Sequence, residues 1–214
     1  MLRFALFNIP VVVHWWFWLT SAALGGILGA SNLDEWLGAA LFMCVAFLSI
    51  LTHEMAHAVI GRRFGARPAV LLHGLGGLTQ LSNSKLTRSQ SVWVSLAGPV
   101  AGIALGLIVL GLRPWIPVTS LVGARALEAL ILVNLGWSVF NLLPILPMDG
   151  GQILRDLAGP RRARLVRWTG LVVAVLVCGA ALMVSQWFLA ILFGILAWQN
   201  LTDERRIPGG VVRQ

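Results

Sequence analysis

The chain has 214 residues, of which 58% are hydrophobic and only 11% are charged, and its mean hydropathy is +0.85. Soluble globular domains carry about 25% charged residues. This composition therefore excludes a protein whose whole surface faces water, and we expect a multi-pass membrane protein covered by lipid. The formal net charge of +8 could indicate nucleic-acid binding. The positions of the basic residues favour a membrane face instead, so the lipid bilayer is the expected partner, and no nucleic acid.

Six apolar segments, each near the length of a spanning helix, predict about six transmembrane helices. They are residues 11–30, 36–60, 91–112, 127–146, 168–184 and 187–201. The first lacks a clear cleavage site and is interpreted as a retained span rather than a signal peptide. The last two predict a C-terminal helical hairpin over about 168–201. We therefore expect an all-α integral membrane fold, in a single domain over residues 1–214.

The basic residues are distributed unequally between the connections. If the N-terminus lies in the cytoplasm, the outer connections contain only Arg113 and Arg125 of the 16 Lys and Arg residues. The others, on the inner side, are Arg3, Arg62, Arg63, Arg67, Lys85, Arg88, Arg155, Arg161, Arg162, Arg164, Arg167, Arg205, Arg206 and Arg213. The positive-inside rule thus predicts a plasma or inner membrane protein with both termini cytoplasmic. The preference for Arg over Lys indicates a bacterial source.

A cluster of polar residues closes the second span, in the sequence His53-Glu54-Met55-Ala56-His57. Positions i and i+4 share one face of a helix, so the two imidazoles can bind one Zn²⁺. Glu54 can act as a general base on water. The alternative, a packed pair of core histidines beside a buried Glu, is costly inside a bilayer without a metal or a partner. We expect one zinc ion per chain.

A third zinc ligand is expected, because zinc in hydrolases usually has three protein ligands and one open position. His14, His73 and Asp149 are the candidates. Asp149 is preferred, since the second and fourth spans both run from outside to inside and end at the same membrane level. Pro144 and Pro147 interrupt the helix before it, and irregular backbone at membrane depth is tolerated only against protein or a wet cavity. An ordinary turn acid is the alternative for Asp149.

These motifs resemble those of the site-2 proteases, a family of intramembrane zinc metalloproteases, over most of the chain. The resemblance rests on residues 53–57, the segment Asn141…Pro144…Asp149-Gly150-Gly151, Ala97-Gly98-Pro99, and less strongly on residues 73–77 and His14. Leu146 and Met148 depart modestly from the family pattern. Many members carry a PDZ or a cystathionine-synthase-type (CBS) domain, and neither is expected here, which predicts a compact form.

The resemblance implies His53, His57 and Asp149 as zinc ligands and Glu54 as general base and acid. It also implies that Asn141 holds the substrate backbone or the developing oxyanion. From the residues alone, Asn141 is a polar group at membrane depth, for which helix–helix hydrogen bonding is an equal alternative.

The connection after the second span has its own pattern. Residues 70–81 are apolar, partly alternating and rich in glycine, which predicts a small re-entrant β-hairpin or loop. The edge of such a hairpin could pair with an extended substrate, and Gly76, Gly77 and Leu78 are the expected substrate-binding residues. A structural plug is the alternative.

Together these features predict a zinc-dependent intramembrane endopeptidase with a catalytic core at about 36–155. Its expected partner is a transmembrane protein substrate, hydrolysed within or near its membrane segment. One alternative is a membrane metallopeptidase acting on soluble peptides. Another is a non-catalytic metal-binding transporter or sensor. Glu54 distinguishes these, because a transporter needs no base between two ligands.

Overall fold

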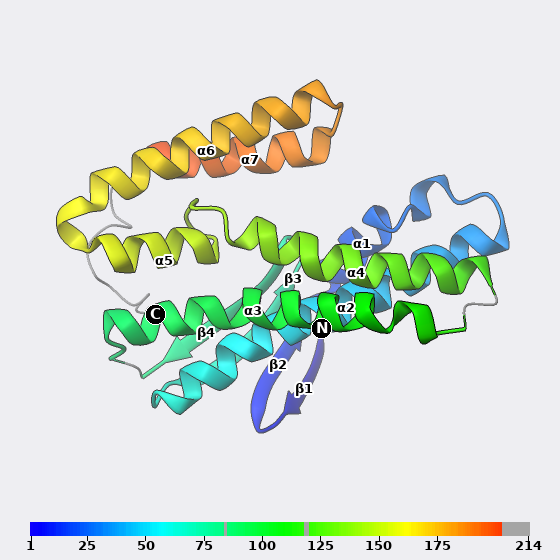
Figure 1. The fold of residues 1–214 in the computed structure, drawn as a ribbon, viewed down its shortest axis with the longest axis horizontal. Coiled ribbons are helices and arrows are strands. Elements are labelled where there is room, and N and C mark those ends of the chain that lie inside the picture. The colour runs from blue at the N-terminus through cyan, green and yellow to red at the C-terminus, as the bar shows by residue number, and fades with distance from the viewer. Residues whose placement is uncertain (84, 118–119, 203–214) are drawn as a thin grey trace. The chain divides into compact units, whose positions relative to one another are not determined.

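The computed structural model describes residues 1–83, 85–117 and 120–202. The chain groups into two compact units, which are described separately (Figure 1). The first comprises residues 1–86 and 97–139, and the second comprises residues 87–96 and 140–214. Of the basic residues used to predict the orientation, Arg205, Arg206 and Arg213 lie outside the described residues.

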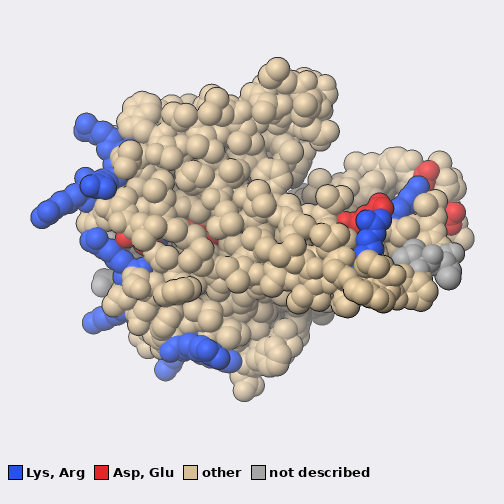
Figure 2. Space-filling view, in the orientation of Figure 1, with Lys and Arg blue, Asp and Glu red and all other residues tan. Residues whose placement is uncertain are grey.

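Within the described residues, four helices are long and apolar enough to cross a membrane. They are α2 (Leu33–Arg63), α3 (Arg88–Leu112), α4 (Leu121–Asn141) and α6 (Ala163–Met183), where short 3-10 turns extend α3 to Trp115 and begin the α6 span at Pro160. A further apolar helix, α7 (Trp187–Thr202), is shorter. On the face drawn in Figure 2 most of the surface is uncharged, and the charged side chains gather in a few places. The prediction of six spanning helices is therefore confirmed only in part.

The expectation of one helix over residues 11–30 is wrong. This region contains β2 (Ile9–Val13) and a ten-residue helix, α1 (Trp15–Leu24). The β-branched residues Val11, Val12 and Val13 favour an extended chain, because their side chains lose freedom in a helix. A second strand, β1 (Leu2–Leu6), precedes β2. The Phe7–Asn8 turn joins the two strands with φ values of 50° and 59°, as in a two-residue hairpin turn.

The fold is not all-α, since the first unit contains a sheet. Among the described residues the strands lie in the order β1-β2-β3-β4, with β3 at Arg67–His73 and β4 at Gly76–Ser82. β3 and β4 form the hairpin expected after the second span, and β2 pairs with β3 in parallel. Val70 and Leu72 of β3 are buried in one apolar core with Met55 and Ala58 of α2, so the sheet packs on the helix that carries the histidines.

The second unit contains α5 (Asp149–Ala158) and the hairpin of α6 and α7, which lie side by side in Figure 1. Ala174 and Phe193 pack in its core with Ile145. The fourth predicted span extended too far, because α4 ends at Asn141. Pro144 and Pro147 follow within two turns, and proline cannot donate the backbone hydrogen bond that a continuing helix needs.

Candidate metal centre and active site

The two histidines occupy successive turns on one face of α2. Their ring centroids lie 4.8 Å apart with an interplanar angle of 76°. His53, Glu54 and His57 are all buried, and each residue is at most 5% exposed. The helix alone therefore brings the two rings together, as the spacing predicted.

The backbone of α3 lies directly against both imidazoles at Gly98. A Cβ atom at this position would lie 2.6 Å from His53 Nε2 and closer still to His57 Nε2. Real Cβ atoms essentially never make contacts under about 3 Å, so any larger residue here would force the two imidazoles to shift. Since the two Nε2 atoms face the same point, their lone pairs can converge on one ion. The space beside Gly98 is thus suited to a metal that an alanine methyl group would displace.

Glu54 faces the β-hairpin. A Cβ atom at Gly77 would lie 2.5 Å from Glu54 Oε1, so β4 passes this side chain in close contact. The hydroxyl group of Thr79, two residues further along the same face of β4, donates to Glu54 Oε2 at 2.7 Å and lies 3.0 Å from the Glu54 carbonyl oxygen. The sequence reasoning missed Thr79, because no local pattern connects it to a residue 25 positions away.

The outer edge of β4 carries backbone groups that do not pair with β3. Pro68 is opposite Leu81, and proline has no N–H, so this pair is not hydrogen-bonded. Hydrogen-bonded and non-bonded pairs alternate along an antiparallel ladder. Gly77 and Thr79 therefore also occupy non-bonded positions, and their N–H and C=O groups point away from β3. Within the described residues β4 pairs with no other strand.

The other predicted hairpin residues have distinct surroundings. Gly76 begins β4 with φ of 125°, and a Cβ atom there would lie 2.5 Å from the indole of Trp137. Leu78 is exposed, and the register pairs its backbone with Leu71 of β3. Substrate binding by Gly76, Gly77 and Leu78 stays a prediction.

Asp149 is the first residue of α5 and is held by a folded loop. A Cβ atom at Gly150 would overlap the Leu142 carbonyl group, and one at Gly151 would lie 2.6 Å from the Ile145 carbonyl oxygen. The two glycines therefore let residues 142–146 fold back over the start of α5. Asn200 of α7, which is buried, donates through Nδ2 to the Leu146 carbonyl oxygen at 2.7 Å.

The contact made by Asn200 also escaped the sequence reasoning, because the two residues are 54 positions apart. Asn141 is the last residue of α4, and its catalytic role stays a prediction.

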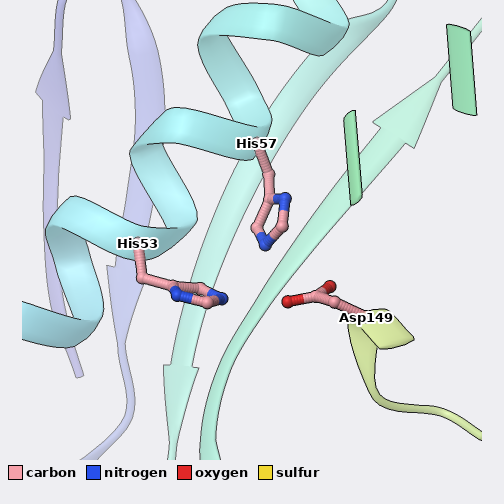
Figure 3. A group of neighbouring side chains, drawn as sticks. All are labelled: His53, His57 and Asp149. Carbon is pink, nitrogen blue, oxygen red and sulfur yellow. The ribbon is translucent and has the colours of Figure 1, made fainter. Parts of the chain in front are cut away.

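In the part of the chain that is described, one group of side chains could hold a metal ion, namely His53, His57 and Asp149. The ligand atoms of these three buried residues all lie within 4.8 Å of one another, and Figure 3 shows the two imidazoles and the carboxylate turned toward a common point. Two imidazoles and one carboxylate form the donor set of many zinc hydrolases. The residues therefore fit a zinc ion with one position left open.

The remaining histidines are not in this group. The His14 side chain caps α1 by accepting from the Trp16 N–H at 3.4 Å. His73 Nδ1 accepts from the Leu75 N–H at 3.2 Å in the β3–β4 turn. Burial lowers the pKa of the His73 imidazole, an effect that the Glu54 carboxylate opposes and His14 reinforces. Desolvation disfavours the charged form of the imidazole.

Comparisons with known proteins agree with this geometry. Residues 118–185 match peptidase family M50. The chain is 30% identical over 153 residues to a zinc metalloprotease of Methanocaldococcus jannaschii. The matched stretch covers 71% of this chain and 43% of that relative. The chain is also 28% identical over 148 residues to stage IV sporulation protein FB of Bacillus subtilis. This matched stretch covers 68% of the chain and 46% of the relative. The chain thus spans less than half the length of these two relatives.

The fold itself is similar to a solved structure, the site-2 protease from Methanocaldococcus jannaschii. The TM-score is 0.70 at 22% sequence identity, over 100% of this chain and 99% of that one. This likeness concerns the fold, and the family match and the curated relatives concern the sequence. The chain belongs to peptidase family M50, the family of the site-2 proteases.

Proposed function

We propose that this protein is a zinc-dependent intramembrane endopeptidase that hydrolyses membrane-protein substrates within or near their transmembrane segment. One observation carries the proposal. The carboxylate of Glu54, the residue after the first of two convergent histidines, lies against one face of β4, the strand at the open edge of the sheet. A base next to an unpaired strand edge suits the hydrolysis of an extended peptide. A transporter or sensor would have no use for this arrangement.

His53, His57 and Asp149 would hold the zinc ion. A zinc ion in such a site supplies a Lewis acid that polarises a carbonyl group and makes water acidic enough to attack at neutral pH. Because residue 98 is glycine, no side chain of α3 fills the space beside the two ring nitrogens at this position. The loop that Asn200 supports fixes the start of α5, and with it the carboxylate of Asp149.

Glu54 is the proposed general base and acid. It would take a proton from the attacking water and return it to the nitrogen of the leaving amine, so that the carboxylate is restored after each cycle. Asn141 would donate its amide hydrogen to the substrate backbone. Both roles require the peptide to lie beside the metal with its carbonyl group accessible.

The substrate would be bound by β4. The carbonyl groups of a transmembrane helix are occupied by internal hydrogen bonds, so the substrate must unwind before hydrolysis. The unwound segment then needs new partners for its backbone. The outward N–H and C=O groups of Gly77 and Thr79 would supply them, as in other complexes where a peptide adds a strand to a sheet.

The orientation we propose has both termini and the basic helix ends in the cytoplasm. Although residues 11–30 do not form one helix, β2 and α1 laid end to end are long enough to cross the bilayer. Five residues of strand and ten of helix span about 31 Å, against a hydrocarbon core of about 30 Å. Arg62, at the basic end of α2, donates to the Phe7 carbonyl oxygen at 2.5 Å. This contact supports placing the β1–β2 turn on the cytoplasmic side.

Proteolysis by the purified protein in liposomes tests the function. We expect the wild type to cleave a co-reconstituted transmembrane substrate. Glu54→Gln should retain zinc while activity falls by a factor of about 10² to 10⁴, the usual contribution of a general acid–base group. Glu128→Gln is the matched control, because Glu128 is an exposed residue on α4 paired with Arg113. Cleavage of a soluble extended peptide alone would favour the peptidase alternative. Zinc binding without any cleavage would favour the transporter or sensor.

A further inference from the structure

We propose that Thr79 is a positioning residue that fixes the Glu54 carboxylate and thereby ties the substrate-binding strand to the catalytic base. This inference rests on the proposed function and concerns the same site. It adds a side chain that neither the metal-binding motif nor the loop before α5 contains. It also gives β4 a second role, since the strand would orient the base as well as bind the substrate.

Two residues of β4 contact the Glu54 carboxylate. The Thr79 hydroxyl group has one hydrogen and two acceptors within reach, and the carboxylate oxygen at 2.7 Å is closer than the backbone oxygen at 3.0 Å. The backbone of Gly77 lies close to the other carboxylate oxygen, Oε1. Glu54 is 5% exposed, so bulk water cannot replace this hydrogen bond. The Glu54 side chain is therefore held by β4 from two neighbouring positions.

The backbone of Thr79 is available to an added strand. Its N–H and C=O groups point away from β3 toward the open edge, because the Val70–Thr79 pair is not hydrogen-bonded. An extended substrate paired with β4 would bond to these groups at a strand spacing of about 4.8 Å. The same residue would then contact the substrate through its backbone and the base through its side chain. Pairing in register would place a peptide bond at a fixed distance from the carboxylate.

The choice of threonine fits this role. Its branched Cβ restricts rotation about χ1 more than serine does, so the hydroxyl group stays directed at Glu54. Valine has the same shape but no hydroxyl group. The pair of substitutions Thr79→Val and Thr79→Ser therefore separates the hydrogen bond from the packing.

The test measures kcat and KM of the full-length protein for a transmembrane substrate in liposomes, together with zinc content and thermal unfolding. In Thr79→Val we expect kcat to fall about 10- to 100-fold, the range found when outer partners of metal sites are removed. KM, zinc content and melting temperature should stay near wild type. Thr79→Ser should recover most of kcat. Thr52→Val is the matched control, because the Thr52 hydroxyl group donates to the Leu48 carbonyl oxygen of its own helix.

A double-mutant cycle distinguishes positioning from a structural tie between β4 and α2. If Thr79 acts through Glu54, Thr79→Val should not lower the residual activity of Glu54→Gln any further. Equal losses in both backgrounds would overturn the inference, as would wild-type kcat in Thr79→Val or failure of Thr79→Ser to recover. Loss of zinc or of folding in Thr79→Val, with recovery of both in Thr79→Ser, would assign the hydroxyl group to structure and also overturn it. Full activity of Glu54→Gln would instead refute the proposed function.

Discussion

Replacing Gly98 with alanine tests whether the metal occupies the space between the histidines and α3. The added methyl group would lie 2.6 Å from His53 Nε2 and closer to His57 Nε2. The backbones of the two regular helices α2 and α3 are held by their own hydrogen bonds and shift less readily than the two imidazole side chains. The imidazoles must therefore rotate, and their ring nitrogens leave the positions from which they converge.

The size of the effect follows from two opposing terms. Alanine favours a helix over glycine by up to about 1 kcal/mol, whereas overpacking a filled site costs about 1–3 kcal/mol. The gain in helix propensity changes the stability of the fold, whereas the overpacking displaces the two ligand nitrogens and so weakens zinc binding. At about 1.4 kcal/mol per tenfold change in affinity, we expect Gly98→Ala to weaken zinc binding about 5- to 150-fold. Its thermal unfolding without zinc should change little.

Competition with a chromophoric chelator would measure the zinc affinity of the detergent-purified protein. Gly111→Ala is the matched control on the same helix, because nothing lies within 4 Å of a Cβ atom there. Gly102→Ala adds a methyl group against Ser138 instead, so it disturbs helix packing without contacting the ligands. Wild-type zinc affinity in Gly98→Ala, or equal losses in Gly98→Ala and Gly102→Ala, would refute the argument.

Two further predictions concern the loop before Asp149 and the orientation. Asn200→Ala should lower zinc affinity about 10-fold or more, because the Leu146 carbonyl group loses its donor and the loop loosens. Thr202→Val removes a hydroxyl group that donates to the Trp198 carbonyl oxygen of the same helix, and it should not change the affinity. In cells, an impermeant maleimide should label a cysteine at Gln186 from outside and one at Arg162 only after permeabilisation. The reverse labelling would contradict the proposed orientation.

The sequence was sufficient where a feature depends on neighbours along the chain. The apolar runs predicted α2, α3, α4, α6 and α7 within a few residues at most ends, because length and hydropathy decide whether a helix can cross a bilayer. The spacing of His53 and His57 predicted that both rings lie on one face, because residues four positions apart share a face of a helix. The hairpin at residues 70–81 was predicted from its alternation and its glycines.

The rest depends on contacts between distant residues. Val11, Val12 and Val13 read as the start of a span because they are apolar, and only pairing with β3 makes them a strand at this position. Thr79 and Asn200 are ordinary polar residues until the fold brings them to Glu54 and Leu146. A β-branched run before a capping His14 was the one local signal that could have indicated β2.

The presence of a sheet beside the histidine helix follows from the chemistry that the proposed reaction needs. A helix next to Glu54 would have every backbone group in its own hydrogen bonds and could offer none to an unwound substrate. An edge strand offers alternate backbone groups along its whole length, and glycine at position 77 lets that strand approach the base. Such an edge would bind other chains indiscriminately in water. In the membrane placement proposed above, only segments that have already unwound would reach β4, so the bilayer itself would restrict which chains are cut.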